Sequence, residues 1–326
     1  MSERAVIVIA GPTASGKSAL ALDLARDFDG TVINADSMQV YRDLPILTAQ
    51  PDAASLAAAP HRLYGALALD DACTAARWAE MALGEIHRAL AENRLPILVG
   101  GTGLYLKALI QGLSPIPEIP AARRAATQEL VAALGAPGLH ARLAVADPEM
   151  AARLQPNDRQ RVMRAWDVLQ ATGRSLAWWQ QQPGTAPRSG AGEPLRFQSF
   201  VVLPPRPALY NACERRFDAM LAAGALDEVR AAVALYPAAS RAGAGFKALG
   251  FRELAGVLAG TVSLEAATAA ARQATRNYAK RQSTWFRTQA PDAIFISPDA
   301  AAMKFSQSYH AGLRQNIRDF LLTLNK

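Results

Sequence analysis

The feature that constrains the fold most is a glycine-rich stretch near the start of the chain, GPTASGKS at residues 11–18. It fits the phosphate-loop pattern G-x-x-x-x-G-K-S/T, and it lies between an apolar run at residues 5–9 and a helix-forming Ala/Leu run. A strand, a loop and a helix in this order bind phosphate, because loop N–H groups and the helix N-terminus converge on the anion. Lys17 adds a positive charge, and the Ser18 hydroxyl can hold Mg²⁺. We therefore predict a di- or triphosphate site formed by Gly11, Pro12, Thr13, Ala14, Ser15, Gly16, Lys17 and Ser18.

Composition narrows the class of protein further. The 326 residues are 51% hydrophobic and 19% charged, which is typical of a globular chain with a large core. The net charge of +7 favours a polyanionic partner. Cys73 and Cys213 lie far apart without metal-ligand spacing, so we expect buried free thiols and a cytoplasmic protein. No apolar run reaches the length of a membrane span, so no membrane partner is expected.

Two further strand ends carry candidate site residues. A short buried strand at residues 31–33 leads to Asp36 and Ser37, and a third strand at 95–99 ends in GGTG with Thr102. Ligands of open parallel sheets bind at the carboxyl ends of strands, so these side chains should face the phosphate loop. Asp36 has three readings: a Mg²⁺-linked acid, a general base aimed at a nucleophile, or part of a helix cap that starts at Ser37.

The chain divides into two regions of different composition. A Pro-rich segment at 113–120 is followed by a basic, wholly helical pattern from 121 to 182 and a Gly/Pro-rich linker at 182–194. Strand and helix patterns then resume at 197. We predict an α/β fold with a parallel sheet of the P-loop NTPase type flanked by helices. Its catalytic core would span 1–113 and 196–326, with an all-helical, nucleic-acid-binding insertion at 114–195.

Three basic segments favour an RNA partner. In NDRQRVMRA, Arg161 and Arg164 share one helix face. The glycine-punctuated loop at 243–252 combines aromatic and cationic residues, which suits base stacking and phosphate contact. The last long helix, expected at 264–288, carries a stripe of like charges that predicts an anion nearby; these are Arg272, Arg276 and Lys280.

Seven phrases taken together resemble one family: GPTASGKS, INADSMQVY, PHRLYG, ILVGGTGLYLKAL, NDRQRVMRA, FKALGFREL and TRNYAKRQSTWFR. The chain is similar from residue 6 to 287 to the bacterial tRNA dimethylallyltransferases. The resemblance implies transfer of a dimethylallyl group from dimethylallyl diphosphate to N6 of the adenosine 3′-adjacent to the anticodon, with Mg²⁺ as cofactor and diphosphate as product. The implied partners are the tRNA anticodon arm and dimethylallyl diphosphate, and we expect a monomer.

The resemblance also implies residue roles. It makes Asp36 the general base and assigns catalytic roles to Asp36, Thr102, Lys17 and Arg216, with Ser18 at the metal. The residues that it implies at the tRNA are Asp36, Ser37, Met38, Gln39, Thr102, Arg124, Gln160, Arg161, Val162, Met163, Arg164, Lys247, Ala248, Leu249, Gly250, Phe251 and Arg252.

Two departures and three alternatives stay open at this stage. Gln50 and Ala212 stand where the family usually has Lys and Arg. The residues alone also allow a small-molecule phosphotransferase, an isopentenyltransferase that acts on free adenine nucleotides, or an RNA-binding ATPase switch. The ATPase switch is disfavoured, because an ATPase needs an apolar strand that ends in Asp. The sequence shows no clear strand of this kind other than the one before Asp36. Whether ATP binds the loop is left open.

Overall fold

The computed structural model describes residues 3–184, 194–238, 241, 243–299 and 306–324. The chain forms two compact units, one from residues 1–110 and 187–326 and the other from 111–186. The first unit holds the sheet and the phosphate loop, and the second is helical.

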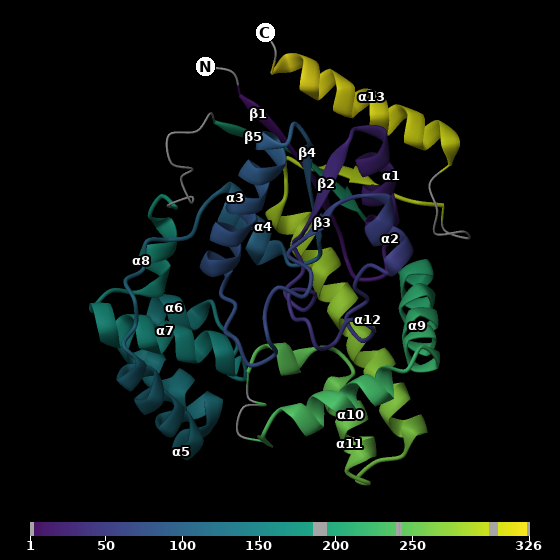
Figure 1. Ribbon diagram of the computed structural model, residues 1–326. Helices are drawn as coiled ribbons and strands as arrows, with labels where there is room; N and C mark the ends of the chain where they lie inside the picture. The colour runs from purple at the N-terminus through teal and green to yellow at the C-terminus, as the bar shows by residue number, and fades with distance from the viewer. Residues whose placement is uncertain (1–2, 185–193, 239–240, 242, 300–305, 325–326) are drawn as a thin grey trace. The chain divides into compact units, whose positions relative to one another are not determined.

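The described strands of the first unit form one parallel sheet in the order β3-β2-β4-β1-β5-β6 (Figure 1). In chain order they are β1 (Arg4–Ala10), β2 (Gly30–Asn34), β3 (His61–Arg62), β4 (Leu95–Gly100), β5 (Leu195–Val202) and β6 (Ile294–Ile296). The strand β1 is central, and its last residue, Ala10, is in register with Gly100 and Val201. The strands β1, β2 and β4 are almost entirely apolar, as expected of parallel strands covered on both faces.

Helices cover both faces of this sheet. Side chains alternate along a strand, so Ile7 and Ile9 point to one face and Val8 to the other. The first face packs against α1 (Lys17–Asp27) and α13 (Gln307–Thr323). The second packs against α3 (Ala75–Ala91), which in turn contacts α4 (Gly103–Ile110). Figure 1 shows α1 and α3 on opposite sides of the strands.

A close approach between β2 and β4 brings the candidate loops together. A Cβ atom at Gly100 would lie 2.1 Å from the backbone carbonyl of Ala35, so this position requires glycine. The residues that follow these two strands therefore emerge beside each other. The same edge receives the phosphate loop after β1, since all these strands run in parallel.

The first unit contains five further helices among the residues that the structure describes. They are α2 (Ala53–Ala58), α9 (Arg206–Ala222), α10 (Ala225–Leu235), α11 (Phe251–Leu258) and α12 (Leu264–Gln289), with a 3₁₀ turn at Gly245–Lys247. The long helix α12 packs against α4, α9 and α11, and so it connects several parts of the unit. None of the described helices is long and apolar enough to cross a membrane.

The second unit consists of α5 (Ala121–Ala146), α6 (Pro148–Ala152), α7 (Arg159–Thr172) and α8 (Leu176–Gln181). Gly135, at φ +70°, interrupts α5 two residues before Pro137. The unit has its own hydrophobic core, in which Leu139, Leu143 and Val162 are fully buried. Asp158 and Ser175 cap α7 and α8 through their side-chain oxygens.

The expected strands and long helices are confirmed to within a few residues, and four details are corrected. The strand expected from 197 begins at Leu195, which pairs with Arg4, so residue 195 belongs to the sheet rather than to the insertion. The two-residue strand β3 was not expected. No helix starts at Ser37, because residues 37–40 form turns. Cys213 is buried as expected, but Cys73 is partly exposed.

We predict that Leu139→Ala lowers the free energy of unfolding by about 2–5 kcal/mol, because it leaves a cavity in the core of the second unit. Leu134→Ala, on the other side of the break in α5, is the control, since Leu134 is 39% exposed and its truncation should cost less than about 1 kcal/mol. Denaturant unfolding followed by tryptophan fluorescence measures both. Equal losses would contradict the packing described here.

Candidate active site

The phosphate loop has the backbone geometry that its glycines predict. At Gly11, with φ +150°, a Cβ atom would lie 2.5 Å from the carbonyl oxygen of Val202, so the loop passes directly over the end of β5. Gly16 adopts the left-handed conformation at φ +89° and places Lys17 as the first residue of α1. The loop thus presents the N-terminus of α1 to a ligand.

Lys17 is buried at the centre of this loop. Its Nζ donates to the carbonyl oxygen of Pro12 at 3.2 Å. Burial lowers the pKa of Lys17 to about 8; the nearby Asp36 carboxylate opposes this shift and the Arg216 guanidinium adds to it. A buried ammonium group in this state gains stability when an anion arrives.

Thr13 is held by residues from α9 and α12. The Arg216 guanidinium donates to the Thr13 hydroxyl, and burial lowers the pKa of this guanidinium. Cys213, one turn earlier on α9, lies 3.9 Å from the Thr13 carbonyl oxygen. In the same loop the hydroxyl of Ser15 is fully buried and has no hydrogen-bond partner among the described residues. The loop therefore combines the buried Lys17 and the buried Ser15 hydroxyl with the half-buried Arg216 of α9.

Asp36 is fixed by the buried side chain of Asn34. The amide oxygen of Asn34 accepts from the Asp36 N–H at 2.8 Å, and its amide nitrogen donates to the Asp36 carbonyl oxygen at 3.0 Å. The indole N–H of Trp78 donates to the Asn34 carbonyl oxygen at 2.9 Å. One carboxylate oxygen of Asp36 accepts from the Met38 N–H at 2.9 Å. These bonds fix the position of the acid after β2 without a helix.

The charge of Asp36 reaches Lys17, Arg216 and three tyrosine phenols. It raises the pKa values of Lys17 and Arg216, although burial still lowers both. The phenols whose pKa values are raised, by burial first and by the Asp36 charge in addition, belong to Tyr64, Tyr105 and Tyr278. The structure therefore brings Asp36, Lys17 and Arg216 into one electrostatic cluster walled by tyrosines.

Thr102 joins the GGTG loop to the segment after β2. Its hydroxyl accepts from the Ser37 N–H at 2.9 Å and lies 3.2 Å from the Ser37 hydroxyl. Its own N–H donates to the carbonyl oxygen of Ala35 at 3.3 Å. Tyr278 of α12 lies near the same threonine. Thr102 thus lies beside Asp36, as the sequence predicts.

Gln282 on α12 was not identified from the sequence, although it lies at the centre of the site. Its amide oxygen accepts from the Thr13 N–H, and its amide nitrogen donates to the Gly101 carbonyl oxygen, both at 2.8 Å. Three residues further on, Trp285 packs so closely that a Cβ at Gly103 would lie 2.2 Å from its ring. A polar residue within a basic helix gives no sequence signal of burial. Only the packing of α12 against the phosphate loop and the GGTG loop reveals it.

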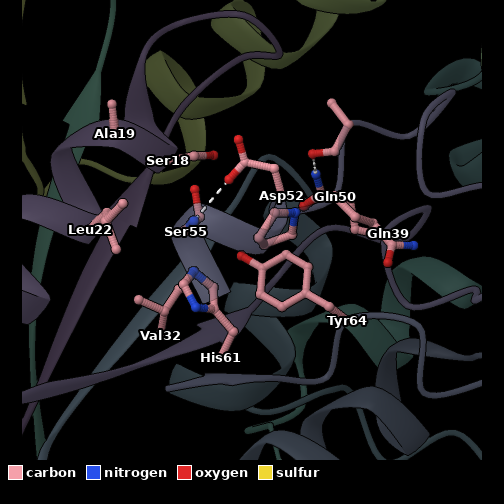
Figure 2. A pocket seen from close by; sticks show the side chains of 12 residues that line it. Ser18, Ala19, Leu22, Val32, Gln39, Gln50, Asp52, Ser55, His61 and Tyr64 are labelled. Atoms are coloured by element: carbon pink, nitrogen blue, oxygen red, sulfur yellow. Dashed lines mark hydrogen bonds between the residues drawn. The ribbon is translucent and has the colours of Figure 1, made fainter. Parts of the chain in front are cut away.

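A cavity of about 320 Å³ opens beside the start of α1. Its lining combines apolar side chains, such as Leu22 and Val32, with oxygen-bearing ones, and Figure 2 shows Ser18, Asp52 and Tyr64 around it. The Asp52 carboxylate accepts from the Ser55 N–H at 2.8 Å and caps α2. No group of three or more His, Cys, Asp or Glu side chains that could hold a metal occurs among the described residues.

Gln50, where the sequence departs from the family pattern, also lines this cavity. Its amide nitrogen donates to the Tyr41 carbonyl oxygen at 2.7 Å. Gln39 binds the same loop, since its amide nitrogen donates to the carbonyl oxygens of Thr48 and Ala49 at 3.0 and 2.6 Å. Both amides stabilise the loop around the cavity through hydrogen bonds to backbone carbonyl oxygens. A lysine at position 50 would bring a positive charge to this cavity in place of the amide.

The candidate RNA-contacting residues of the first unit divide by burial. Lys247 and Arg252 are exposed and present their charges to solvent. Ala248 and Phe251 are 5% and 4% exposed, so their side chains pack inside the protein. Gly250 is buried as well, at φ +90° just before α11, and Leu249 is half-buried. The motif therefore presents two exposed cations, while its apolar side chains pack inside the protein or are half-buried.

The second unit shows the same division. Arg161 and Arg164 are exposed on α7, and Arg161 pairs with Asp158 at 3.4 Å. The pKa of Arg164 is lowered by burial and, in part, by the charge of Arg124 on α5, so two candidate cations lie close together. Val162 is fully buried in the core of the second unit. Gln160 is exposed and Met163 half-buried.

The anion expected beside the α12 stripe is supplied in part by the protein itself. Arg272 and Arg276 form ion pairs with Asp218 and Glu214 of α9. Two of the three cations of the stripe therefore link α12 to α9 through ion pairs.

Comparison with known proteins agrees with this geometry. Residues 39–289 match the IPP transferase family. The chain is 54% identical to the tRNA dimethylallyltransferase of Rhodospirillum centenum over 93% of its length and 96% of the relative's, and 54% identical to that of Paramagnetospirillum magneticum over 97% of both chains. The chain belongs to this family. It is an enzyme, a prenyltransferase that modifies tRNA.

Solved structures of the family share the fold. The tRNA isopentenylpyrophosphate transferase of Bacillus halodurans is similar with a TM-score of 0.66 and 30% identity, over 99% of this chain and 96% of that one. A eukaryotic dimethylallyltransferase, captured acting on tRNA, gives a TM-score of 0.78 and 25% identity over 98% of this chain and 80% of its own. The parallel sheet with a phosphate loop is thus the fold of the tRNA dimethylallyltransferases.

We predict that inorganic diphosphate, in metal-free buffer, binds the wild-type protein more tightly than Lys17→Met, and that the difference shrinks as the pH rises through 8. The sign follows from the pKa of Lys17, which is about 8 without an anion, so the ammonium charge that attracts diphosphate is lost above this pH. Calorimetric titration over a pH series measures both proteins. A difference that stays constant with pH would contradict the burial of this charge.

Proposed function

We propose that the protein transfers a dimethylallyl group from dimethylallyl diphosphate to N6 of the adenosine 3′-adjacent to the anticodon. One observation carries this proposal: Asp36 lies close enough to Lys17 and Arg216 to shift the pKa values of both. An acid near two cations can remove a proton from one reactant while the cations hold the leaving group of the other.

The phosphate loop would hold the diphosphate of the donor. The backbone N–H groups at the start of α1 and the Ser15 hydroxyl would meet its oxygens. Negative charge develops on the diphosphate as the bond between the allylic carbon and oxygen breaks. Lys17 and Arg216 would stabilise this charge, and their burial makes the interaction stronger than it would be in water.

The residues beside the loop fit a magnesium ion. Mg²⁺ takes oxygen ligands and commonly binds through one or two protein groups together with phosphate oxygens. The exposed Ser18 hydroxyl and the Asp52 carboxylate line one cavity at the start of α1. We assign Ser18 as the residue that would hold Mg²⁺, with Asp52 available beside it. The ion, when bound, neutralises charge on the diphosphate.

The acceptor would approach from the side of Asp36 and Thr102. The exocyclic amine of adenine is a weak nucleophile, because its lone pair is delocalised into the ring. As the new N6–carbon bond forms, the amine loses a proton, which the Asp36 carboxylate takes. The Thr102 hydroxyl and the half-buried Tyr278 adjoin this position. The adenosine must be flipped out of its stack to enter such a site.

The anticodon arm would be held by exposed cations on both units. Lys247 and Arg252 lie in the first unit, and Arg124, Arg161 and Arg164 lie in the second. Phosphate contacts of this type position an RNA and make its binding depend on salt. Ser37, Met38 and Gln39 follow Asp36 directly and are only half-buried, so they can meet the flipped nucleotide and its neighbours.

The proposal is tested by incubating the protein with dimethylallyl diphosphate, Mg²⁺ and an anticodon stem-loop with adenosine at the target position. We expect the adenosine to gain one dimethylallyl group, detected by mass spectrometry of nucleosides. A stem-loop with inosine there, which has no N6 amine, should stay unmodified. Modification of free adenosine monophosphate in preference to the stem-loop would contradict the choice of acceptor.

Asp36→Asn should lower the turnover number by about 10²–10⁴-fold, because an amide cannot accept the proton of the amine. Asp70→Asn is the matched control: Asp70 is an exposed carboxylate of the same unit and its loss should leave turnover unchanged. Steady-state transfer to the stem-loop measures both variants. Normal turnover of Asp36→Asn would exclude its role as the base.

Arg161→Ala and Arg164→Ala should each weaken tRNA binding and flatten its dependence on salt concentration. Each arginine that neutralises a phosphate contributes about 0.7–0.9 to the slope of log affinity against log salt. Affinities at several salt concentrations give this slope, with Arg153→Ala as the control because Arg153 is a cation of the same unit that lies outside the segments proposed at the tRNA. A slope identical to that of the wild type would mean that these side chains do not meet phosphate.

A further inference from the structure

We propose that Gln282 is a positioning residue that fixes the phosphate loop against the loop carrying Thr102, and so sets the distance between the donor and the base. This inference rests on the proposed function. The hydrogen bonds on which the inference is based do not depend on that function, because they are contacts within the first unit.

One side chain makes both connections. Gln282 is 5% exposed, and its amide oxygen accepts from the Thr13 N–H while its amide nitrogen donates to the Gly101 carbonyl oxygen. Both bonds are 2.8 Å long. A buried donor and a buried acceptor from loops separated in sequence are thus satisfied by a single planar group.

The connection continues from Gly101 to the base. The next residue, Thr102, binds both the N–H and the hydroxyl of Ser37, which follows Asp36. On the other side, Thr13 also receives the Arg216 guanidinium on its hydroxyl. Gln282 therefore stands between the group that would hold the leaving diphosphate and the group that would hold the acceptor.

The space around the amide is closely matched to it. A Cβ atom at Gly101 would lie 2.2 Å from the amide nitrogen of Gln282 and 3.0 Å from the carbonyl oxygen of Gly11. The two loops are in direct proximity only because position 101 is glycine and the amide fills the gap. A longer or shorter side chain at 282 would change their separation.

Only an amide satisfies both partners. Methionine preserves length and approximate volume but offers neither hydrogen bond. Glutamate still accepts from the Thr13 N–H, yet it sets an oxygen against the Gly101 carbonyl oxygen and adds a negative charge near the diphosphate. The two variants therefore remove the connection in different ways, and each should disturb the alignment of the reactants.

The expected effect is on the chemical step. Gln282→Met should lower kcat about 10–100-fold, since small misplacements of reacting groups cost about 10²-fold. The KM for dimethylallyl diphosphate should change much less, because Lys17, Arg216 and the loop N–H groups remain. Gln282→Glu should lower kcat as well and raise this KM through charge repulsion.

Thr275→Val is the matched control for stability. Thr275 is a buried residue of the same helix, 5% exposed, and its hydroxyl donates only to the Ala271 carbonyl oxygen within α12. Its loss should lower the melting temperature without lowering kcat. Should Gln282→Met fail to fold, Gln282→Glu, which keeps one of the two bonds, is measured in its place against the same control.

A double variant separates positioning from a merely structural role. In an Asp36→Asn background no base is left to align, so Gln282→Met should lower kcat much less than it does in the wild type. Equal penalties in the two backgrounds would overturn the inference, as would unchanged kcat in the single variant. If the wild-type protein failed to modify the stem-loop, the proposed function would fail instead, and the two failures are thereby distinguished.

Discussion

The whole site depends on the desolvation of two cations at the carboxyl end of a parallel sheet. Lys17 is buried and Arg216 half-buried, and loss of hydration lowers the pKa values of both. The nearby carboxylate of Asp36 offsets this cost only in part. The phosphate loop is thus a positive site that an anionic ligand would complete, with the carboxylate of Asp36 nearby.

The parallel sheet makes this arrangement from separate segments of the chain. Because β1, β2 and β4 run in the same direction, the phosphate loop, Asp36 and Thr102 all emerge at one edge. Gly100 allows β2 and β4 to approach each other, and α12 closes the site from beyond the edge with Tyr278, Gln282 and Trp285. Under the proposed function, a loop typical of phosphoryl transfer would hold a leaving group.

The sequence predicts those parts of the site whose chemistry and local pattern coincide. Gly11 and Lys17 belong to a spaced motif, and Asp36 follows an apolar strand, so their positions could be inferred. Gln282 could not, because burial of one polar residue on a basic helix depends on tertiary packing. Val162 and Phe251 show the converse: a motif that resembles an RNA-contact segment also contains residues that serve the core. The ion pairs of Arg272 and Arg276 with α9 likewise depend on tertiary packing, which the sequence alone does not show.

The claim that the loop holds a leaving diphosphate is tested most directly by following the phosphorus atoms of the donor. Dimethylallyl diphosphate labelled at phosphorus is incubated with the protein, Mg²⁺ and the anticodon stem-loop. The account predicts that the label is released as inorganic diphosphate, one for each dimethylallyl group gained by the RNA. Label recovered as orthophosphate or on the RNA, in proportion to turnover, would contradict it.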